Sequence, residues 1–253
     1  MPETAFSAEE MMTVAAARAL PNGAVCFVGI GLPSSAANLA RRMHAPDLVL
    51  IYESGTIGAK PDVLPLSIGD GELAETASTV VSTPEVFRYY LQAGRIDVGF
   101  LGAAQIDGLG NINTTVIGDY RRPKVRLPGA GGAPEIVSSS GEVFVIVRQS
   151  KRTFVETLDF VTSVGWREGG LGRAKGVTRV ITNLGILQRE ANGKELILAQ
   201  VHPGVTEDEI REATGWNLKT APDVTETEAP TAAELSTLRD LQERTSRAHA
   251  RRQ

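Results

Sequence analysis

Short apolar runs alternate along the chain with segments that carry the marks of amphipathic helices. Ser7 and Glu10 form a capping-box pattern ahead of the first apolar segment, which predicts an N-terminal helix. A second helix at 34–40 is predicted between apolar runs at 24–28 and 48–52, each short enough to be a buried strand. Strand, helix and strand in this order predict a parallel βαβ unit.

The same alternation continues to the C-terminal part of the chain. It predicts a fold of the α/β class, with a mostly parallel open sheet and flanking helices. Two long stretches, 55–83 and 102–141, are rich in Gly, Pro, Asn and Asp, and loops of this length are more often functional than idle. The further elements that we expect are helices at 84–91 and 206–210 and strands at 96–101, 142–147, 179–182 and 196–199.

A change in composition after Pro222 predicts a division of the chain. Residues 1–222 carry the α/β pattern and form the main domain. Residues 223–253 begin with a polar, proline-bearing stretch and continue with a helix-favouring one. We expect this tail to be a linker followed by a helix that lies on the surface or docks on a partner.

Composition excludes several classes of function. The 26 basic residues against 30 acidic ones give a net charge of −4, which argues against a nucleic-acid-binding surface. The single cysteine and three scattered histidines predict neither a disulfide nor a metal site. No apolar run approaches the roughly 20 residues of a membrane-spanning helix. With no secretion signal in the N-terminal segment, we expect a cytoplasmic protein that does not enter a membrane.

The turn that begins at Gly29 has some features of a dinucleotide-binding turn. Gly29 and Gly31 match its first two glycines, and Glu53 stands near the ~20-residue distance of a ribose-binding acid. Ser34 replaces the third glycine, which is needed for close packing of helix on strand. An ordinary strand-to-helix turn is therefore the preferred interpretation, and a non-catalytic dinucleotide-binding module remains an alternative.

Glu53 is the first candidate for a reactive group. It follows the apolar strand 48–52, and ligands of open α/β sheets bind at the carboxyl ends of the strands. Ser54 and Gly55 come next and would let a substrate approach closely. A solvated glutamate that caps a nearby helix explains this pattern equally well.

Two of the long loops carry further candidate residues. Around a turn-forming Asp-Gly pair, the first loop presents side chains that suit a polar ligand, namely Gln105, Asp107, Asn111 and Asn113. These groups would equally satisfy the backbone of their own loop. A second loop is a near-continuous glycine run whose backbone N–H groups suit an oxyanion hole, formed by Gly129, Ala130, Gly131 and Gly132. A flexible turn is the alternative there.

Together these loops, in this order, resemble a known family. The chain is similar to the β subunit of class I coenzyme A transferases, in the group of the glutaconate and 3-oxoadipate CoA-transferases. The resemblance covers nearly the whole chain and is specific as a set. The motifs that carry it are VGIGLP at 28–33, YESG at 52–55, LSIGD at 66–70, GAAQIDGLGNINTTVIGDY at 102–120, PGAGGA at 128–133, DFVTSVGW at 159–166, HPGV from 202 and TGW from 214.

The resemblance implies a fold, a reaction and a partner. It implies the NagB/RpiA/CoA transferase-like fold, with Glu53 as the catalytic nucleophile and the 129–132 loop lining the acyl-CoA site. Ser54, Gly55 and the polar residues of the first loop would then contact CoA or the acid. No cofactor is implied, because CoA is a substrate. The α subunit of the transferase would complete a heterodimer or a higher oligomer.

The implied reaction is a ping-pong transfer through a glutamyl-CoA thioester. A donor such as succinyl-CoA or acetyl-CoA would pass its CoA to a dicarboxylic or 3-oxo acid. Relatives that share the fold but lack the glutamate hydrolyse or decarboxylate CoA esters. An acyl-CoA hydrolase or decarboxylase is thus the main alternative, and retention of Glu53 argues against it.

Overall fold

The computed structural model describes residues 5–168, 174–190 and 193–251. Its strands are β1 (Val25–Phe27), β2 (Val49–Ile51), β3 (Thr56–Ile57), β4 (Thr79–Val80), β5 (Val98–Leu101), β6 (Gln105–Ile106), β7 (Ile112–Asn113), β8 (Val116–Gly118), β9 (Pro123–Arg126), β10 (Glu142–Ile146), β11 (Val177–Ile181), β12 (Gly185–Arg189), β13 (Leu196–Val201) and β14 (Thr220–Glu226). Its helices are α1 (Ala8–Arg18), α2 (Leu32–Met43), α3 (Gly71–Thr76), α4 (Thr83–Glu85), α5 (Ala133–Ser139), α6 (Glu207–Glu212) and α7 (Ala232–Ala250), with a π-helical segment η1 (Val86–Leu91).

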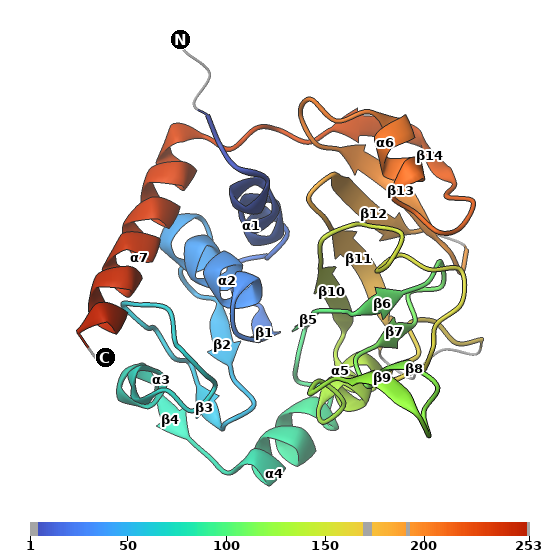
Figure 1. The fold of residues 1–253 in the computed structure, drawn as a ribbon. Helices are drawn as coiled ribbons and strands as arrows, with labels where there is room; N and C mark the ends of the chain where they lie inside the picture. The colour runs from blue at the N-terminus through green and yellow to red at the C-terminus, as the bar shows by residue number, and fades with distance from the viewer. Residues whose placement is uncertain (1–4, 169–173, 191–192, 252–253) are drawn as a thin grey trace.

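A ten-stranded sheet organises the described residues, in the order β14-β13-β12-β11-β10-β5-β1-β2-β3-β4 (Figure 1). The central strands β2, β1, β5, β10 and β11 are all parallel. Beyond them the pairing becomes antiparallel, through β12 and β13 on one side and β3 and β4 on the other. The predicted α/β fold with a mostly parallel open sheet is confirmed.

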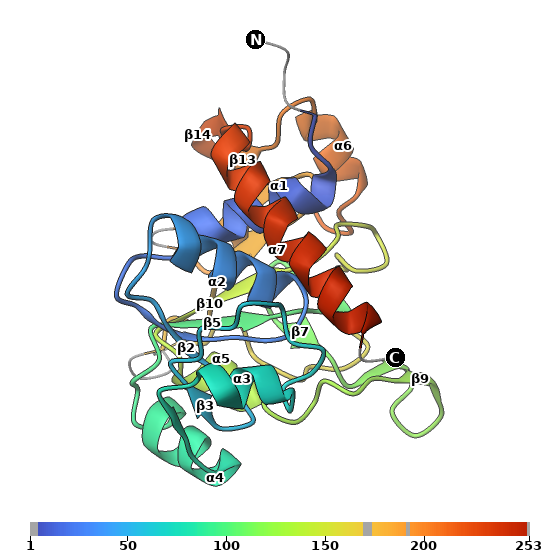
Figure 2. The ribbon, with the colours of Figure 1, turned by 90° about the vertical axis from the view of Figure 1, so that its left-hand side faces the viewer.

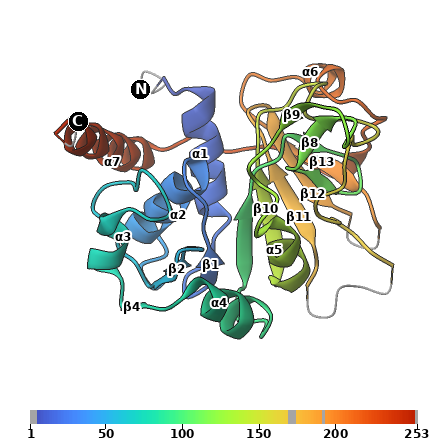
Figure 3. The same cartoon turned by 60° about the horizontal axis from the view of Figure 1, so that its bottom comes forward.

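Both faces of this sheet are buried, which explains the continuous apolar runs of the central strands. Neighbouring residues alternate between two hydrophobic clusters: Cys26 and Leu50 face α1, α2 and α7, whereas Phe27 and Ile51 face the opposite side. Figure 3 shows the first group of helices on one side of the sheet, with α5 and the short hairpin strands on the other. The carboxyl ends of the central strands are thus held by apolar packing on both faces of the sheet.

The C-terminal helix α7 lies across α1 and α2 (Figure 2). It buries Leu235, Leu238 and Leu241, and Glu234 in its first turn pairs with Arg18 of α1 at 2.7 Å. Before it, β14 joins the main sheet by pairing with β13. The tail therefore packs on the rest of this chain, and its division from the main domain at residue 222 stays a prediction.

The predicted helix at 84–91 has an unexpected form. It begins as the single turn α4 and continues as the π-helix η1, in which Gln92 N–H donates to Phe87 O at 2.9 Å and Arg95 N–H donates to Tyr90 O at 2.8 Å. π-Helical turns are rare and occur frequently at functional sites. η1 contacts α5, so it lies against the helix that follows the glycine loop.

Candidate active site

Glu53 stands on a tight turn directly after the central strand β2. Tyr52 anchors this turn, because its side chain is fully buried and its hydroxyl lies 3.0 Å from Ser34 Oγ. Burial raises the pKa of Tyr52, so the phenol stays protonated. The backbone closes through Tyr52 N–H, which donates to Thr56 O at 3.0 Å. The turn therefore holds the following residue, Glu53, at the rim of the sheet.

Gly55 makes this turn possible. Its φ is +111°, and a Cβ at this position would lie 1.8 Å from Val81 O. Val81 N–H donates to Gly55 O at 3.0 Å, so the β4 segment closes over the glycine. Any larger residue would push the two segments apart. This steric need explains the glycine by itself, and a contact between Gly55 and substrate stays a prediction.

The Glu53 carboxylate is partly buried and lies against Gly132, the residue that precedes α5. A Cβ added to Gly132 would lie 3.0 Å from Glu53 Oε1 and 3.0 Å from Phe87 Cζ. Within the described part of the chain, Glu53 makes no hydrogen bond or ion pair. No described residue holds this carboxylate in a structural ion pair, and its role in catalysis stays a prediction.

The glycine loop leads up to this carboxylate. Gly129, Ala130 and Gly131 are exposed, whereas Gly132 is buried. Thr114 fixes the start of the loop, because its Oγ1 donates to Gly129 O at 2.8 Å. The N–H groups of Gly131 and Gly132 donate to no acceptor among the described residues. Two predicted parts of the site, the strand-end glutamate and the glycine loop, are therefore adjacent, while their roles in catalysis stay predictions.

The predicted polar-ligand residues form hydrogen bonds within their own region. Asn113 Nδ2 donates to Gln105 Oε1 at 2.8 Å, and Asn113 Oδ1 accepts from two backbone N–H groups. Asp107 accepts from Asn111 Nδ2 at 2.8 Å, and Asn111 Oδ1 accepts from Gly165 N–H at 3.0 Å. These contacts give the four residues a structural role in the 105–116 hairpin region. Their contact with CoA or substrate stays a prediction.

Ser54 differs from these loop residues. Its Oγ is buried and has no hydrogen-bond partner in the described residues, and the same holds for Oγ1 of Thr56 two positions on. Two unsatisfied hydroxyls therefore flank the turn that carries Glu53. Buried hydroxyls of this kind are expected to find a partner in a ligand, water or another chain.

Phe87 belongs to this site and was missed by the sequence reasoning. It lies on η1, and its ring packs edge-on against Phe27, with centroids 6.2 Å apart. The pattern around it indicated only an amphipathic helix. Its nearness to Glu53 depends on long-range packing, for which the sequence carries no local signal.

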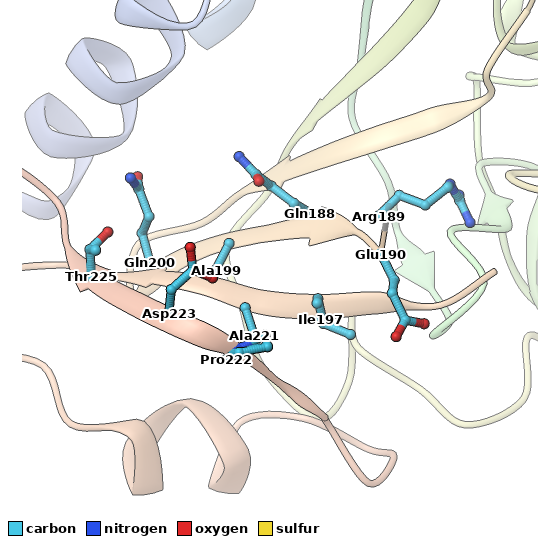
Figure 4. A pocket seen from close by; sticks show the side chains of 10 residues that line it. All are labelled: Gln188, Arg189, Glu190, Ile197, Ala199, Gln200, Ala221, Pro222, Asp223 and Thr225. Carbon is cyan, nitrogen blue, oxygen red and sulfur yellow. The ribbon is translucent and has the colours of Figure 1, made fainter. Parts of the chain in front are cut away.

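A cavity of about 510 Å³ lies elsewhere, over the strands β12, β13 and β14 (Figure 4). β12 is five strands from β2 in the sheet, which is roughly 24 Å at the usual strand spacing. Burial lowers the pKa of Arg189 to about 10, and its guanidinium donates to backbone carbonyls, including Val177 O at 2.9 Å. The cavity is separate from Glu53. Its lining residues are Gln188, Arg189, Glu190, Ile197, Ala199, Gln200, Ala221, Pro222, Asp223 and Thr225.

Among the described residues, no three or more His, Cys, Asp and Glu side chains come together in a way that could hold a metal ion. No helix in the described ranges is both long enough and apolar enough to cross a membrane.

The fold and site define an α/β protein that presents a carboxylate at a sheet rim, beside the last residue of a glycine loop and with no partner in the described ranges. Residues 9–213 match the model of the coenzyme A transferase family. The chain belongs to this family.

Similar proteins support the same assignment. The chain is 65% identical over 252 residues to the B subunit of 3-oxoadipate CoA-transferase from Pseudomonas knackmussii, with 97% of each chain covered. The crystal structure of glutaconate coenzyme A-transferase from Acidaminococcus fermentans superposes with a TM-score of 0.87 at 34% identity, covering 93% of this chain and 94% of the other. The resemblance predicted from the motifs, and with it the class of enzyme, is confirmed.

The alternative chemistry is represented by a more distant structure. The decarboxylase AibA/AibB superposes with a TM-score of 0.83 at 26% identity, covering 97% of this chain and 98% of that one. The fold alone therefore does not separate transfer from decarboxylation, and the separation depends on the site.

Proposed function

We propose that this chain is the catalytic β subunit of a CoA transferase that moves CoA from an acyl-CoA donor to a dicarboxylic or 3-oxo acid. The observation that carries the proposal is the partly buried carboxylate of Glu53, which lies against Gly132 and has no partner among the residues that the structure describes. Among acceptors, 3-oxoadipate is the first to test, because it is named in the relative with 65% identity. CoA is then a substrate, no further cofactor is required, and we expect the reaction to take place in the cytoplasm.

In the proposed reaction Glu53 is the nucleophile. Its carboxylate attacks the thioester carbonyl of the donor, and CoA thiolate leaves to give an acyl-glutamyl anhydride. The thiolate then attacks the glutamyl carbonyl, and the donor acid leaves, which gives a glutamyl-CoA thioester. The acceptor acid runs these steps in reverse and departs as its CoA ester, restoring the carboxylate.

Each step passes through a tetrahedral oxyanion, which needs donors that are already in place. Gly132 lies beside the carboxylate, Gly131 precedes it in the loop, and the N–H groups of both have no acceptor of their own among the described residues. We assign them this role. Loss of one such donor typically costs about 3 kcal/mol of transition-state stabilisation.

We further propose that the α subunit of the transferase completes the site. The relative with 65% identity is named as the B component of its enzyme, and the glycine loop is exposed at Gly129, Ala130 and Gly131. Both covalent intermediates are open to hydrolysis, so this side of the site must be closed during turnover. A second chain over the sheet rim would close it.

The test uses the complex of this chain with its α subunit. Glu53→Ala is expected to abolish CoA transfer while the two subunits still co-purify, and Glu212→Ala, which removes an exposed carboxylate elsewhere, is expected to leave transfer unchanged. With acyl-CoA and no acceptor, the wild-type complex should carry CoA on the Glu53 peptide, found by mass spectrometry. Borohydride should reduce this thioester to the alcohol of residue 53 and release CoA thiol. Full turnover without this adduct would contradict the mechanism.

Product analysis separates the alternatives. Without an acceptor, a transferase releases at most one equivalent of donor acid per site, and it turns over and forms a new CoA ester only when the acceptor acid is present. A hydrolase releases free CoA without an acceptor, and a decarboxylase releases carbon dioxide from the CoA ester itself.

A further inference from the structure

We propose that Phe87 is a positioning residue that restrains the Glu53 carboxylate and keeps water from its carbonyl carbon, so that CoA is transferred rather than lost. This inference rests on the proposed function. Phe87 Cζ and Glu53 Oε1 each lie 3.0 Å from one point, the Cβ position of Gly132. Phe87 Cζ and Glu53 Oε1 are therefore separated by no more than twice that distance, and the tip of the ring lies beside Gly132 on the same side as the carboxylate.

The ring is held firmly in this place. Phe27, which ends β1 and is only 2% exposed, meets it edge to face at an interplanar angle of 70°. The backbone of Phe87 is fixed by the π-helix, whose neighbouring residues Val86 and Leu91 are fully buried. Phe87 thus joins the core of the sheet to the reactive rim and has little freedom to move away.

The direction of the ring suits a carboxylate. An aromatic ring carries partial positive charge at its edge, and Cζ, an edge atom, is the Phe87 atom that lies 3.0 Å from the Cβ position of Gly132. Such an edge does not repel a nearby carboxylate oxygen, and it offers water no hydrogen-bonding group. It therefore disfavours a water molecule beside the carboxylate.

Water is the competitor that matters in this reaction. Its oxygen would attack the carbonyl carbon of the glutamyl-CoA thioester, forming a C–O bond while the C–S bond breaks and the electron pair leaves on sulfur. The two water protons pass to the thiolate and to solvent, and the Glu53 carboxylate is restored. The energy of the donor thioester is then lost without transfer. An apolar side chain beside this carbon lowers the rate of that loss.

The experiment measures the lifetime of the adduct. The complex of this chain with its α subunit is loaded with acetyl-CoA, freed of excess donor and kept without acceptor, and release of free CoA thiol is followed over time. Phe87→Ala is expected to speed this release about tenfold or more, a change of at least ~1.4 kcal/mol. Phe87→Leu keeps an apolar wall and should restore most of the lifetime.

Tyr89→Ala is the matched control. Tyr89 lies on the same π-helix but is 53% exposed, and its loss should leave the lifetime unchanged. A lifetime like that of wild type in both Phe87 variants would overturn the inference while the proposed function stands. A wild-type complex that forms no adduct would overturn both, at an earlier step.

A further pair of variants covers the case in which Phe87→Ala does not assemble. Phe87→Leu should then keep the lifetime of the wild-type adduct, because an apolar wall suffices. Phe87→Asn places a polar amide at the same position and should shorten the lifetime. Equal lifetimes in these two variants would overturn the inference.

Discussion

The carboxylate of Glu53 lies beside Gly132, where a side chain of residue 132 would begin, although one residue follows the central strand β2 and the other precedes the helix α5. A Cβ at residue 132 would lie 3.0 Å from Oε1 and 3.4 Å from Cδ of Glu53. A real Cβ atom at residue 132 would therefore be closer to the carboxylate than side chains normally tolerate. The glycine therefore leaves room for the carboxylate and for whatever becomes bonded to it.

The first prediction concerns the space beside Gly132 that the Glu53 carboxylate occupies. Gly132 has φ −85° and ψ −18°, a conformation that alanine adopts without strain, so Gly132→Ala tests the space alone. The new methyl group must displace the carboxylate, Phe87 or both, and we expect kcat/KM to fall by about 10²-fold. The free energy of unfolding should change by no more than about 1 kcal/mol.

Gly69→Ala is a suitable control for this substitution. A Cβ at Gly69 would have Ser67 Oγ at 3.8 Å as its nearest neighbour, an ordinary contact. Steady-state kinetics of the two variants, beside urea unfolding, give the comparison. Similar activities in Gly132→Ala and the wild-type protein would show that the glycine is not needed for the carboxylate.

The second prediction concerns the turn after Glu53. Gly55→Ala combines an unfavourable φ of +111° with a clash at 1.8 Å against Val81 O, and should lower the free energy of unfolding by more than about 3 kcal/mol. Gly23→Ala also has a positive φ, +77°, but no neighbour within 4 Å. It should cost only the ~1–2 kcal/mol of the backbone conformation. If urea unfolding shows the same loss of unfolding free energy in Gly55→Ala and Gly23→Ala, contact with β4 does not fix the turn.

Much of this architecture is local in origin, which is why it could be predicted. The buried parallel strands are short apolar runs bounded by turn residues, so the position of Glu53 at the carboxyl end of β2 follows from the pattern. The outer strands β12 and β14 were missed because Gln188, Thr225 and their neighbours interrupt the apolar runs. Their pairing depends on partners that only the folded chain brings beside them.

In the candidate site, too, the residues with a local sequence signal could be predicted and those placed by long-range packing could not. Glu53 and the glycine loop were predicted, but Phe87 was not, since only the folded chain brings η1 beside them. The polar loop illustrates a second difficulty. An amide such as Asn113 serves a ligand or its own backbone with the same chemistry, and here its hydrogen bonds are made within the chain. Residue type therefore could not distinguish the two roles.

The third prediction is a dependence of stability on pH that arises at His202. This side chain is buried, its Nε2–H donates to Thr182 O at 2.9 Å, and its Nδ1 accepts from Thr227 Oγ1 at 3.1 Å. Burial is the main cause that lowers the pKa of His202, and the hydrogen bond to Thr182 offsets part of this effect. The folded chain therefore holds the ring in its neutral form.

The sign of the effect follows from that shift. In the unfolded chain His202 becomes protonated at about pH 6.5, whereas in the folded chain it becomes protonated only at a lower pH. The stabilisation is complete above about pH 6.5 and is lost as the pH falls from there toward the folded-state pKa. Unfolding free energies measured between about pH 7.5 and pH 5.5 should fall less steeply in His202→Gln than in the wild-type protein. If the unfolding free energies of the two proteins change with pH at the same slope, His202 is not the origin of the pH dependence.

The last prediction concerns α7 and the loop that it supports. Leu238 is fully buried in the cluster shared with α1 and α2, and further along the helix Thr245 Oγ1 accepts from Leu64 N–H at 2.9 Å. Leu238→Ala should lower the free energy of unfolding by about 2–5 kcal/mol, because the neighbouring helices cannot fully close the cavity. The substitution Ser236→Ala, at an exposed residue of the same helix, should change the free energy of unfolding by less than about 0.5 kcal/mol.

The Leu238→Ala variant also separates stability from activity. Leu238 and Phe87 belong to different hydrophobic clusters, so the cavity in Leu238→Ala should not disturb the site, and kcat of the folded enzyme should be retained. A loss of kcat without a loss of stability would instead mean that α7 acts on the site, through the loop it holds.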